Sequence, residues 1–467
     1  MIAFFAPGFA WIWAAIRPGS VVGALALLLG IGAPFTLGCT HPQLTSDGTG
    51  GTPGTPLDGG VDRPGDAPRD TGPSRGPTPP QPGVRFPFPQ NRMSSGCIYP
   101  TGYRNEDVVA AYAQWKADTV TAAGAGGHLR VKRPRDPGLE ADSTVSEGIG
   151  YGMLIAVYMG DADAQHLFDE LWKYEQLHRN VNNLMDWNIS ADGSKALGTG
   201  GAGDADEDMA FALIMADRQW GGRGSLDKSY LDYAKEQLAN IWAHEVVDGK
   251  LLSGGDQGFD WHCVNISYFA PAFYRVFAKF DHVDAGSAGW EAVIKTVYDT
   301  IDNALDPAKN GNQRNQSNGL VPAWCDSSGP PNSTCPTGAT HYQYDSCRTP
   351  FRIGLDACWF GTAAARTYLA KVSGFFNAIG ASKIVDGYAL DGTPQPAFAV
   401  DGGQSAAFVG PAGVGAMSVP AYQSFVDQTY AAVATRKLLV GGTYYDESWT
   451  VLSLLMMTGN FLDYTAY

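Results

Sequence analysis

The segment AQHLFDELWKYEQL, residues 164 to 177, decides the fold class expected for this chain. Its large apolar side chains recur at intervals of three or four residues, the spacing that places side chains on one face of an α-helix. They are Leu167, Phe168, Leu171, Trp172 and Tyr174. Packing in a core explains these aromatic residues, so none of them is a candidate for a functional site.

The same helical period continues through the rest of the chain, and the alternation typical of strands is scarce. Amphipathic helices are predicted at residues 105–122, 147–159, 163–178, 204–218, 226–243, 267–280, 287–304, 346–370, 418–437 and 445–458. Long loops rich in Gly, Asn and Asp separate them. This pattern favours an all-α fold in which helix pairs stack around a common axis, with the loops lining one end.

The N-terminal region divides into two segments that precede the folded domain. Residues 1–39 are mostly apolar and end in Thr-Leu-Gly-Cys39, which resembles a bacterial lipoprotein box in which the cysteine is lipidated. A non-lipidated signal or an uncleaved anchor stays open. Residues 40–85 are rich in Gly, Pro, Thr and Ser and predict a disordered linker. Residues 86–467 are expected to form the folded domain of an exported protein, lipid-anchored at the outer membrane or cell surface, or secreted.

Six cysteines follow Cys39, an even number that favours disulfides in an exported protein. Cys325 and Cys335 flank a Gly-Pro-Pro loop and are the first expected pair. Cys347 and Cys358 would lie about 16 Å apart on one continuous helix, too far to pair. Neither a CxxC pair nor HExxH occurs, so neither a metal nor a cofactor is expected.

The formal net charge of −15 bears on the class of partner. Nucleic acid and phosphate-rich membrane surfaces carry the same sign of charge, so neither is an expected partner. A neutral or cationic polymer is compatible with this charge, and membrane contact is expected only through the N-terminal segment. We expect a monomer.

The motif SEGIGYGM, residues 146–153, opens an apolar helix. Ser146 can cap that helix and Glu147 can interact with its dipole, so a capping role would explain both residues. The three glycines are poor helix formers, and they indicate a close approach of the backbone to a neighbour or a ligand.

The motif GDADEDMAFAL, residues 203–213, places two carboxylates on one helix face. Asp204 and Asp208 are four residues apart, where like charges repel, so an additional interaction must favour holding them there. N-capping by Asp204 is the structural alternative.

The motif HYQYDSCRTPFR, residues 341–352, sets Asp345 between tyrosines and arginines. A buried Asp–Arg ion pair would explain Asp345 without catalysis. Together, however, the three motifs supply what glycoside hydrolysis requires, which is one carboxylic acid to protonate the leaving oxygen and one carboxylate to activate water.

These motifs, with Gln219-Trp220-Gly221 and the segment NISYF at 265–269, resemble the signatures of glycoside hydrolase family 8 in the same order. The resemblance covers residues 95–460. It implies an (α/α)6 barrel, an inverting mechanism and β-1,4-linked polysaccharide as substrate. Glu147 matches the family's general acid, Asp345 the base of the subgroup with an aspartate there, and Asp204 a third acidic residue that binds and distorts the sugar.

The resemblance also implies three substrate-binding residues. Tyr268 matches a tyrosine near the attacking water, Arg348 an arginine that pairs with the site carboxylates, and Trp187 a tryptophan that stacks on a sugar ring. Gly203, where Ser or Thr is usual, and Ile266, where proline is common, depart from the family pattern.

The function expected from this resemblance is endo-β-1,4-glucanase activity, that of a cellulase. Chitosanase, xylanase or lichenase is the alternative, because the same carboxylates serve all of them. A catalytically inactive carbohydrate-binding lipoprotein would keep the aromatic residues but would not need both Glu147 and Asp345.

Overall fold

The computed structural model describes residues 83–134, 140–281, 286–398, 404–438 and 443–467. The expected export segment and the linker as far as residue 82 lie outside the described residues. The helices are α1 Asn105–Thr119, α2 Ser146–Met159, α3 Ala162–Leu177, α4 Gly203–Gln219, α5 Tyr230–His244, α6 Pro271–Phe277, α7 Gly286–Leu305, α8 Thr349–Phe360, α9 Ala363–Ile379, α10 Ala406–Ala416, α11 Gln423–Ala434 and α12 Thr443–Met457. Short 3₁₀ helices are η1 Ile266–Tyr268, η2 Ala381–Lys383, η3 Pro420–Tyr422 and η4 Tyr464–Ala466.

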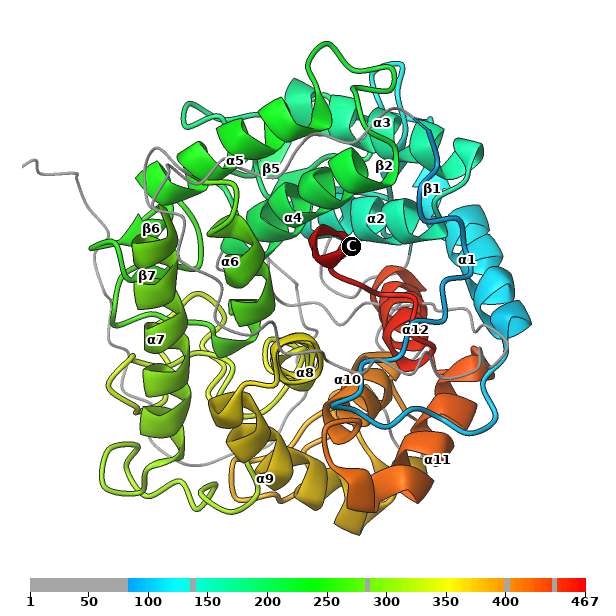
Figure 1. Ribbon diagram of the computed structural model, residues 1–467. Coiled ribbons are helices and arrows are strands. Elements are labelled where there is room, and N and C mark those ends of the chain that lie inside the picture. The colour runs from blue at the N-terminus through cyan, green and yellow to red at the C-terminus, as the bar shows by residue number, and fades with distance from the viewer. Residues whose placement is uncertain (1–82, 135–139, 282–285, 399–403, 439–442) are drawn as a thin grey trace, which may run out of the picture. The chain divides into compact units, whose positions relative to one another are not determined.

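The even-numbered helices form a closed inner ring (Figure 1). Each contacts the next even-numbered helix, from α2 through α4, α6, α8 and α10 to α12, which contacts α2 again. The odd-numbered helices lie outside: α3 on α2, α5 on α4, α7 on α6, α9 on α8, α11 on α10, and α1 on α12. Six helix pairs around one axis constitute an (α/α)6 barrel, so the expected fold is confirmed.

Burial follows from position in the ring. Every residue of α2, α4 and α10 is buried, because these inner helices have neighbours on all sides. Outer helices such as α3 and α7 bury one face only, which is why their sequences show the clearer period. Among the described residues, no helix is long and apolar enough to cross a membrane.

Strands are confined to short antiparallel pairings in the loops. They are β1 Val120–Thr121, β2 Arg130–Val131, β3 Thr144–Val145, β4 Asn188–Ile189, β5 Ala196–Gly198, β6 Val246–Val247 and β7 Leu251–Leu252. The three-stranded sheet has the order β3-β4-β5, with Thr144 opposite Ile189 and Val145 opposite Asn188. Because β3 leads directly into α2, this sheet sets where the helix begins.

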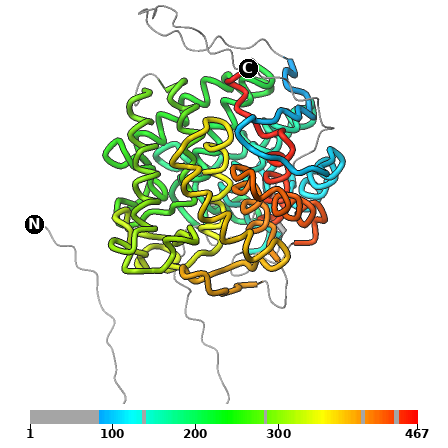
Figure 2. Tube along the Cα trace, turned by 60° about the horizontal axis from the view of Figure 1, so that its bottom comes forward, coloured from blue at the N-terminus to red at the C-terminus, as the bar shows by residue number. Residues whose placement is uncertain are grey.

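The two ends of the described chain lie side by side (Figure 2). Phe86 stacks on Tyr464 with ring centroids 4.2 Å apart. The backbone amides of Gly83 and Arg85 donate to the carbonyls of Trp220 and Gln219, at 2.8 and 2.9 Å. Ordered contacts with the barrel are therefore already present at residue 83.

The predicted helices differ in extent from those observed, and the difference has a clear local cause in two of them. The helix expected at 346–370 is interrupted at Gly361, whose φ of +66° is in the left-handed region that ends helices, so it forms α8 and α9. The helix expected at 267–280 is shorter, because η1 precedes it and α6 begins only at Pro271.

The prediction missed α10, whose sequence AAFVGPAGVGA has poor helix propensity. Packing explains why the helix forms. A Cβ on Gly410 would come within 2.2 Å of Ser453 Oγ, and one on Gly413 within 2.2 Å of the Met457 side chain. The glycines thus let α10 approach α12 closely, and this tertiary contact overrides local propensity.

The expected Cys325–Cys335 disulfide is wrong. The structure pairs Cys97 with Cys358 and Cys263 with Cys335, and it leaves Cys325 and Cys347 as buried thiols. The backbone of Cys325 exchanges two hydrogen bonds with Val264, at 2.8 and 3.0 Å, and the Cys325 side chain is buried. That strand-like pairing places Cys263 near this segment, and Cys263 forms its disulfide with Cys335 rather than with Cys325.

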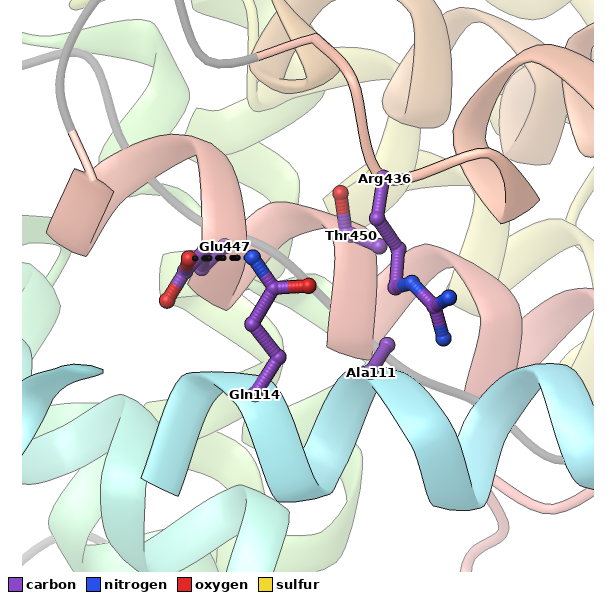
Figure 3. Close-up of a pocket in the computed structure, with 5 residues that line it drawn as sticks. All are labelled: Ala111, Gln114, Arg436, Glu447 and Thr450. Atoms are coloured by element: carbon purple, nitrogen blue, oxygen red, sulfur yellow. Dashed lines mark hydrogen bonds between the residues drawn. The ribbon is translucent and has the colours of Figure 1, made fainter. Parts of the chain in front are cut away.

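A small pocket lies between α1, α12 and Arg436 (Figure 3). In it, Gln114 Nε2 donates to Glu447 Oε1 at 3.2 Å. Burial, assisted by the nearby Asp118 carboxyl, raises the pKa of Glu447 to about 9 from an ordinary value of 4.5. The folded chain therefore binds this proton more tightly than the unfolded chain, so the contribution of Glu447 to stability falls as pH rises between these two values.

Candidate active site

Glu147 lies in the first turn of α2, at the end of the barrel where β3 enters. Ser146 donates its backbone N–H to the Trp187 carbonyl at 3.0 Å, which ties the helix start to a neighbouring loop. The alternative of a side-chain cap is wrong, because Val145 occupies the N-cap and no side chain caps α2. Glu147 is 5% exposed and accepts hydrogen bonds from side chains instead.

The Glu147 carboxyl receives three donors. Tyr151 OH donates to Oε1 at 2.7 Å, Arg348 Nη1 to Oε1 at 2.5 Å, and Tyr444 OH to Oε2 at 2.6 Å. Burial raises the pKa of Glu147 to about 8, against the lowering effect of Arg348, and Asp204 raises it further. At neutral pH this carboxyl is therefore mostly protonated, the state that a general acid requires.

Two arginines explain how α4 holds its repelling aspartates. Arg348 Nη1 pairs with Asp204 Oδ2, and one turn later Arg352 binds Asp208 through two bonds of 2.5 and 3.0 Å. Arg348 is the N-cap of α8 and Arg352 lies in its first turns, so their i, i+4 spacing matches that of Asp204 and Asp208 on α4. Asp204 also accepts from the Ala205 amide at 3.0 Å, but Ala202 is the N-cap, so capping is not its main interaction.

Asp345 lies just before α8 and is fully buried. Gln343 Nε2 donates to its Oδ2 at 2.9 Å. The ion pairs of Arg348 and Arg352 are made with other carboxylates, and no basic residue of the described chain lies within ion-pair distance of Asp345. The alternative of a structural Asp–Arg pair is therefore wrong.

The ionisation of Asp345 differs from the simple expectation that Arg348 would keep it charged. Burial outweighs the arginine and raises the pKa of Asp345 to about 7, while Asp204 raises it further. A reaction that needs Asp345 ionised and Glu147 protonated would accelerate as pH rises through about 7 and slow above about 8.

Tyr268 ends η1 beside these groups. The Arg348 guanidinium lies over its ring at 4.9 Å, and Arg348 Nε donates to Ser267 Oγ at 3.1 Å. Asn265 caps η1 by accepting the Ser267 amide at 2.9 Å, so Ile266 is accommodated without a proline. The hydroxyl of Tyr268 and Oδ1 of Asp345 are buried, and neither has a hydrogen-bond partner among the described residues.

Gly203 and Trp187 show how tightly the surrounding loops pack. A Cβ on Gly203 would come within 2.5 Å of the Ser253 carbonyl, which explains glycine at this position. A Cβ on Gly198 would come within 2.1 Å of the Trp187 ring, so this glycine lets the backbone lie against the indole. Trp187 is only 6% exposed.

The structure thus brings Glu147, Asp204, Tyr268 and Arg348 into direct contact through Arg348, with Asp345 three residues before it. Tyr151 and Tyr444 are partners of Glu147 that the sequence motifs did not indicate. Tyr151 stands at i+4 on the same helix, a spacing that could have found it. Tyr444 comes from α12, and only the closure of the ring brings it there.

The family model for glycosyl hydrolases family 8 matches residues 96–459. The chain belongs to this family. It is 36% identical over 398 residues to Endoglucanase 2 of Ruminiclostridium josui, covering 82% of this chain and 78% of that protein. It is also 36% identical to Endoglucanase A of Acetivibrio thermocellus, covering 75% of this chain and 69% of that protein.

A solved structure is similar over nearly the same region. The apo structure of a β-1,3-1,4-glucanase from Paenibacillus sp. X4 shares 30% identity with a TM-score of 0.70, covering 81% of this chain and 99% of that one. The expected family is therefore confirmed, and the chain is a glycosidase.

Proposed function

We propose that this protein is an endo-acting β-glucanase that cleaves internal β-1,4-glycosidic bonds of cellulose or a related β-glucan with inversion. The observation that carries the proposal is the contrast between two buried carboxyls near one arginine. Glu147 is held protonated near neutral pH, while Asp345 keeps one oxygen without a partner among the described residues and ionises at lower pH.

In the proposed reaction, Glu147 donates its proton to the glycosidic oxygen as the bond to the anomeric carbon breaks. A water molecule attacks that carbon from the opposite face, and Asp345 accepts the proton that the water loses. Asp204, fixed by Arg348, holds the sugar ring beside the cleaved bond, and Trp187 contributes an aromatic surface. The products are two shorter chains, with the new reducing end in the inverted configuration.

Glucan is favoured over the alternative substrates because two relatives that are 36% identical to this chain are named endoglucanases, and the similar solved structure is named a β-1,3-1,4-glucanase. The net charge of −15 favours binding of chitosan, which is cationic. Xylan stays an alternative because the same carboxylates serve its hydrolysis. A non-catalytic binding protein would not need a carboxyl that burial keeps protonated, as it does Glu147, so this alternative is not favoured.

A panel of polymers tests this proposal. A soluble form beginning at residue 83 should release reducing ends from carboxymethylcellulose and barley β-glucan at least about tenfold faster than from xylan or chitosan, a difference of about 1.4 kcal/mol in the barrier. Proton NMR during hydrolysis should show the α-anomer first. Initial release of the β-anomer would contradict inversion, and activity confined to chitosan or xylan would replace the substrate.

We further infer that the protein acts as an exported monomer tethered through a lipid on Cys39, with the chain between Cys39 and the barrel contacts at residue 83 as the spacer. The box at Cys39 and the composition of the spacer support this. Cys39→Ser should move the enzyme from the membrane fraction to the soluble fraction, because a diacyl anchor supplies most of the hold. Immunoblots of both fractions measure the change. An unchanged membrane fraction would show that the apolar segment itself is the anchor.

A further inference from the structure

Trp187 lies in the segment between α3 and α4, immediately before β4. Its backbone N–H donates to the Gly200 carbonyl at 2.9 Å, and its own carbonyl accepts from the Ser146 amide at 3.0 Å. Both bonds extend the pairing of the β3-β4-β5 sheet. The backbone of Trp187 is therefore held between the start of α2 and the glycine-rich segment that leads into α4.

Two aspartates hold this glycine-rich segment. The consecutive amides of Gly200 and Gly201 donate to Asp186 Oδ1 and Asp256 Oδ1, each at 2.8 Å. The φ of Gly200 is +97°, a conformation in which a side chain is strained, and a Cβ there would come within 2.9 Å of Asp256 Oδ1. Glycine is therefore needed at position 200 for the Asp256 carboxylate to lie this close to the backbone.

The second oxygen of Asp256 binds the chain that precedes Trp187. Asn180 Nδ2 and Asn182 Nδ2 donate to Asp256 Oδ2 at 2.7 and 2.9 Å. Asn180 also shapes the turn, because its Oδ1 accepts the amides of Asn182 and Leu184 at 2.8 and 3.3 Å. One carboxylate from the connection between β7 and η1 thus joins the stretches of chain before and after Trp187.

Asp256 and Asp186 are held near each other although both are acidic. Burial raises the pKa of Asp186, the Gly200 amide lowers it, and the nearby Asp256 raises it again. Arg179, which precedes this segment, pairs with Glu175 at 2.8 Å instead. Asparagine at position 256 would have the same size without the repulsion, but only a carboxylate accepts hydrogen bonds on both of its oxygens. The need for two acceptors explains the charge at this position.

We propose that Asp256 is a positioning residue for substrate binding, which holds the chain on both sides of Trp187 so that the indole is oriented to bind a sugar ring. The inference rests on the proposed function, in which Trp187 contributes an aromatic surface. Asp256 is not among the groups that transfer protons in the proposed reaction. Its loss should therefore weaken binding of the polymer rather than the chemistry at Glu147 and Asp345.

Asp204 should keep its place when Asp256 is changed, because the start of α4 has an anchor of its own. Ala202, the N-cap of α4, donates its amide to Asp206 Oδ2 at 3.1 Å, and this bond does not involve Asp256. A rise in KM at constant kcat is therefore the result expected of a residue that acts through Trp187, whereas a general distortion of the site would lower kcat as well.

Asp256→Asn keeps the size of the side chain and turns one acceptor into a donor. We expect KM on barley β-glucan to rise about tenfold with kcat within about twofold of the parent, because binding alone is weakened. Trp187→Ala should raise KM at least as much, and the double variant should not exceed Trp187→Ala, because both changes act on one indole. Asp192→Asn is the matched control and should leave KM unchanged, since Asp192 Oδ1 also accepts from three uncharged donors, those of Ser190 and Ser194 in the turn between β4 and β5, at 2.7 to 3.0 Å.

The inference is overturned if Asp256→Asn raises KM by the same factor with tryptophan and with alanine at position 187, or if it lowers kcat and leaves KM in place. If Asp256→Asn does not fold, Asn182→Ala removes one donor to the same carboxylate, and a smaller rise in KM with the same dependence on Trp187 is expected. Trp187→Ala separates the two proposals. A raised KM in that variant with an unchanged KM in Asp256→Asn refutes this inference alone, whereas an unchanged KM in Trp187→Ala refutes the aromatic surface of the proposed function first.

Discussion

Asp345→Asn should lower kcat on soluble β-glucan by about 10² to 10⁴-fold, the range that general-base assistance supplies, with KM little changed. The amide keeps the size of the carboxyl and can still accept from Gln343, but it cannot take a proton from water. Initial rates over a range of substrate concentrations measure both constants. In Asp345→Gly, added azide should restore turnover, because this small anion attacks without a base.

The thermal stability of Asp345→Asn distinguishes a general base from a carboxylate with a structural role. Burial raises the pKa of Asp345 from 3.8 to about 7, so the folded protein binds its proton more tightly than the unfolded chain. Ionising the group therefore costs stability as pH rises between those values. Asp345→Asn removes that cost, and its Tm at neutral pH should equal or exceed that of the parent.

Retention of more than about a tenth of the parent kcat would contradict the role of Asp345, because lost base catalysis costs more than that. The alternative is a loop carboxylate such as Asp326, which belongs to the same connection between α7 and α8. In the structure Asp326 pairs with His262 at 2.5 Å and accepts the Ser328 amide at 2.8 Å. Asp326→Asn would then be the next variant, although these contacts already occupy the carboxylate.

The fold could be predicted from sequence because outer helices must show one apolar face to the ring. The period at residues 164–177 reports that face directly, and α3 begins and ends within two residues of it. Helix α10 could not be found in this way. Its glycines are explained only by the close approach of α12, which begins at Thr443, well after α10 ends at Ala416.

The part of the candidate site that could be predicted is the part where residues close in sequence repel each other and therefore need oppositely charged partners from elsewhere in the chain. The repulsion between Asp204 and Asp208 required cations at matching spacing, and Arg348 and Arg352 provide them. The ionisation of Asp345 was not predictable, because the arginine nearby in sequence pairs with other carboxylates and burial then decides. The same holds for the disulfides, since Cys97 and Cys358 are 261 residues apart and meet only through tertiary packing.

Glu147→Gln should reduce kcat on polymeric glucan about as strongly as the loss of the base, by about 10² to 10⁴-fold. The leaving oxygen of a glucan chain is a poor leaving group unless it is protonated, and an amide cannot supply that proton. A dinitrophenyl oligoglucoside leaves without protonation, so on this substrate most of the activity should remain. Comparing the two substrates on one enzyme preparation measures the effect without concern for folding.

The pH profile provides the second test of Glu147. The alkaline limb of the parent should fall above about pH 8, where the buried acid loses its proton. In Glu147→Gln, activity on the dinitrophenyl substrate should stay level through this range while the acid limb from Asp345 remains. Glu447→Gln is the matched control, because it makes the same change at another buried carboxyl with a raised pKa, on the α1 side of α12 and without a hydrogen bond to the site. It should keep both limbs, and an alkaline limb that survives in Glu147→Gln would assign the general acid to another group.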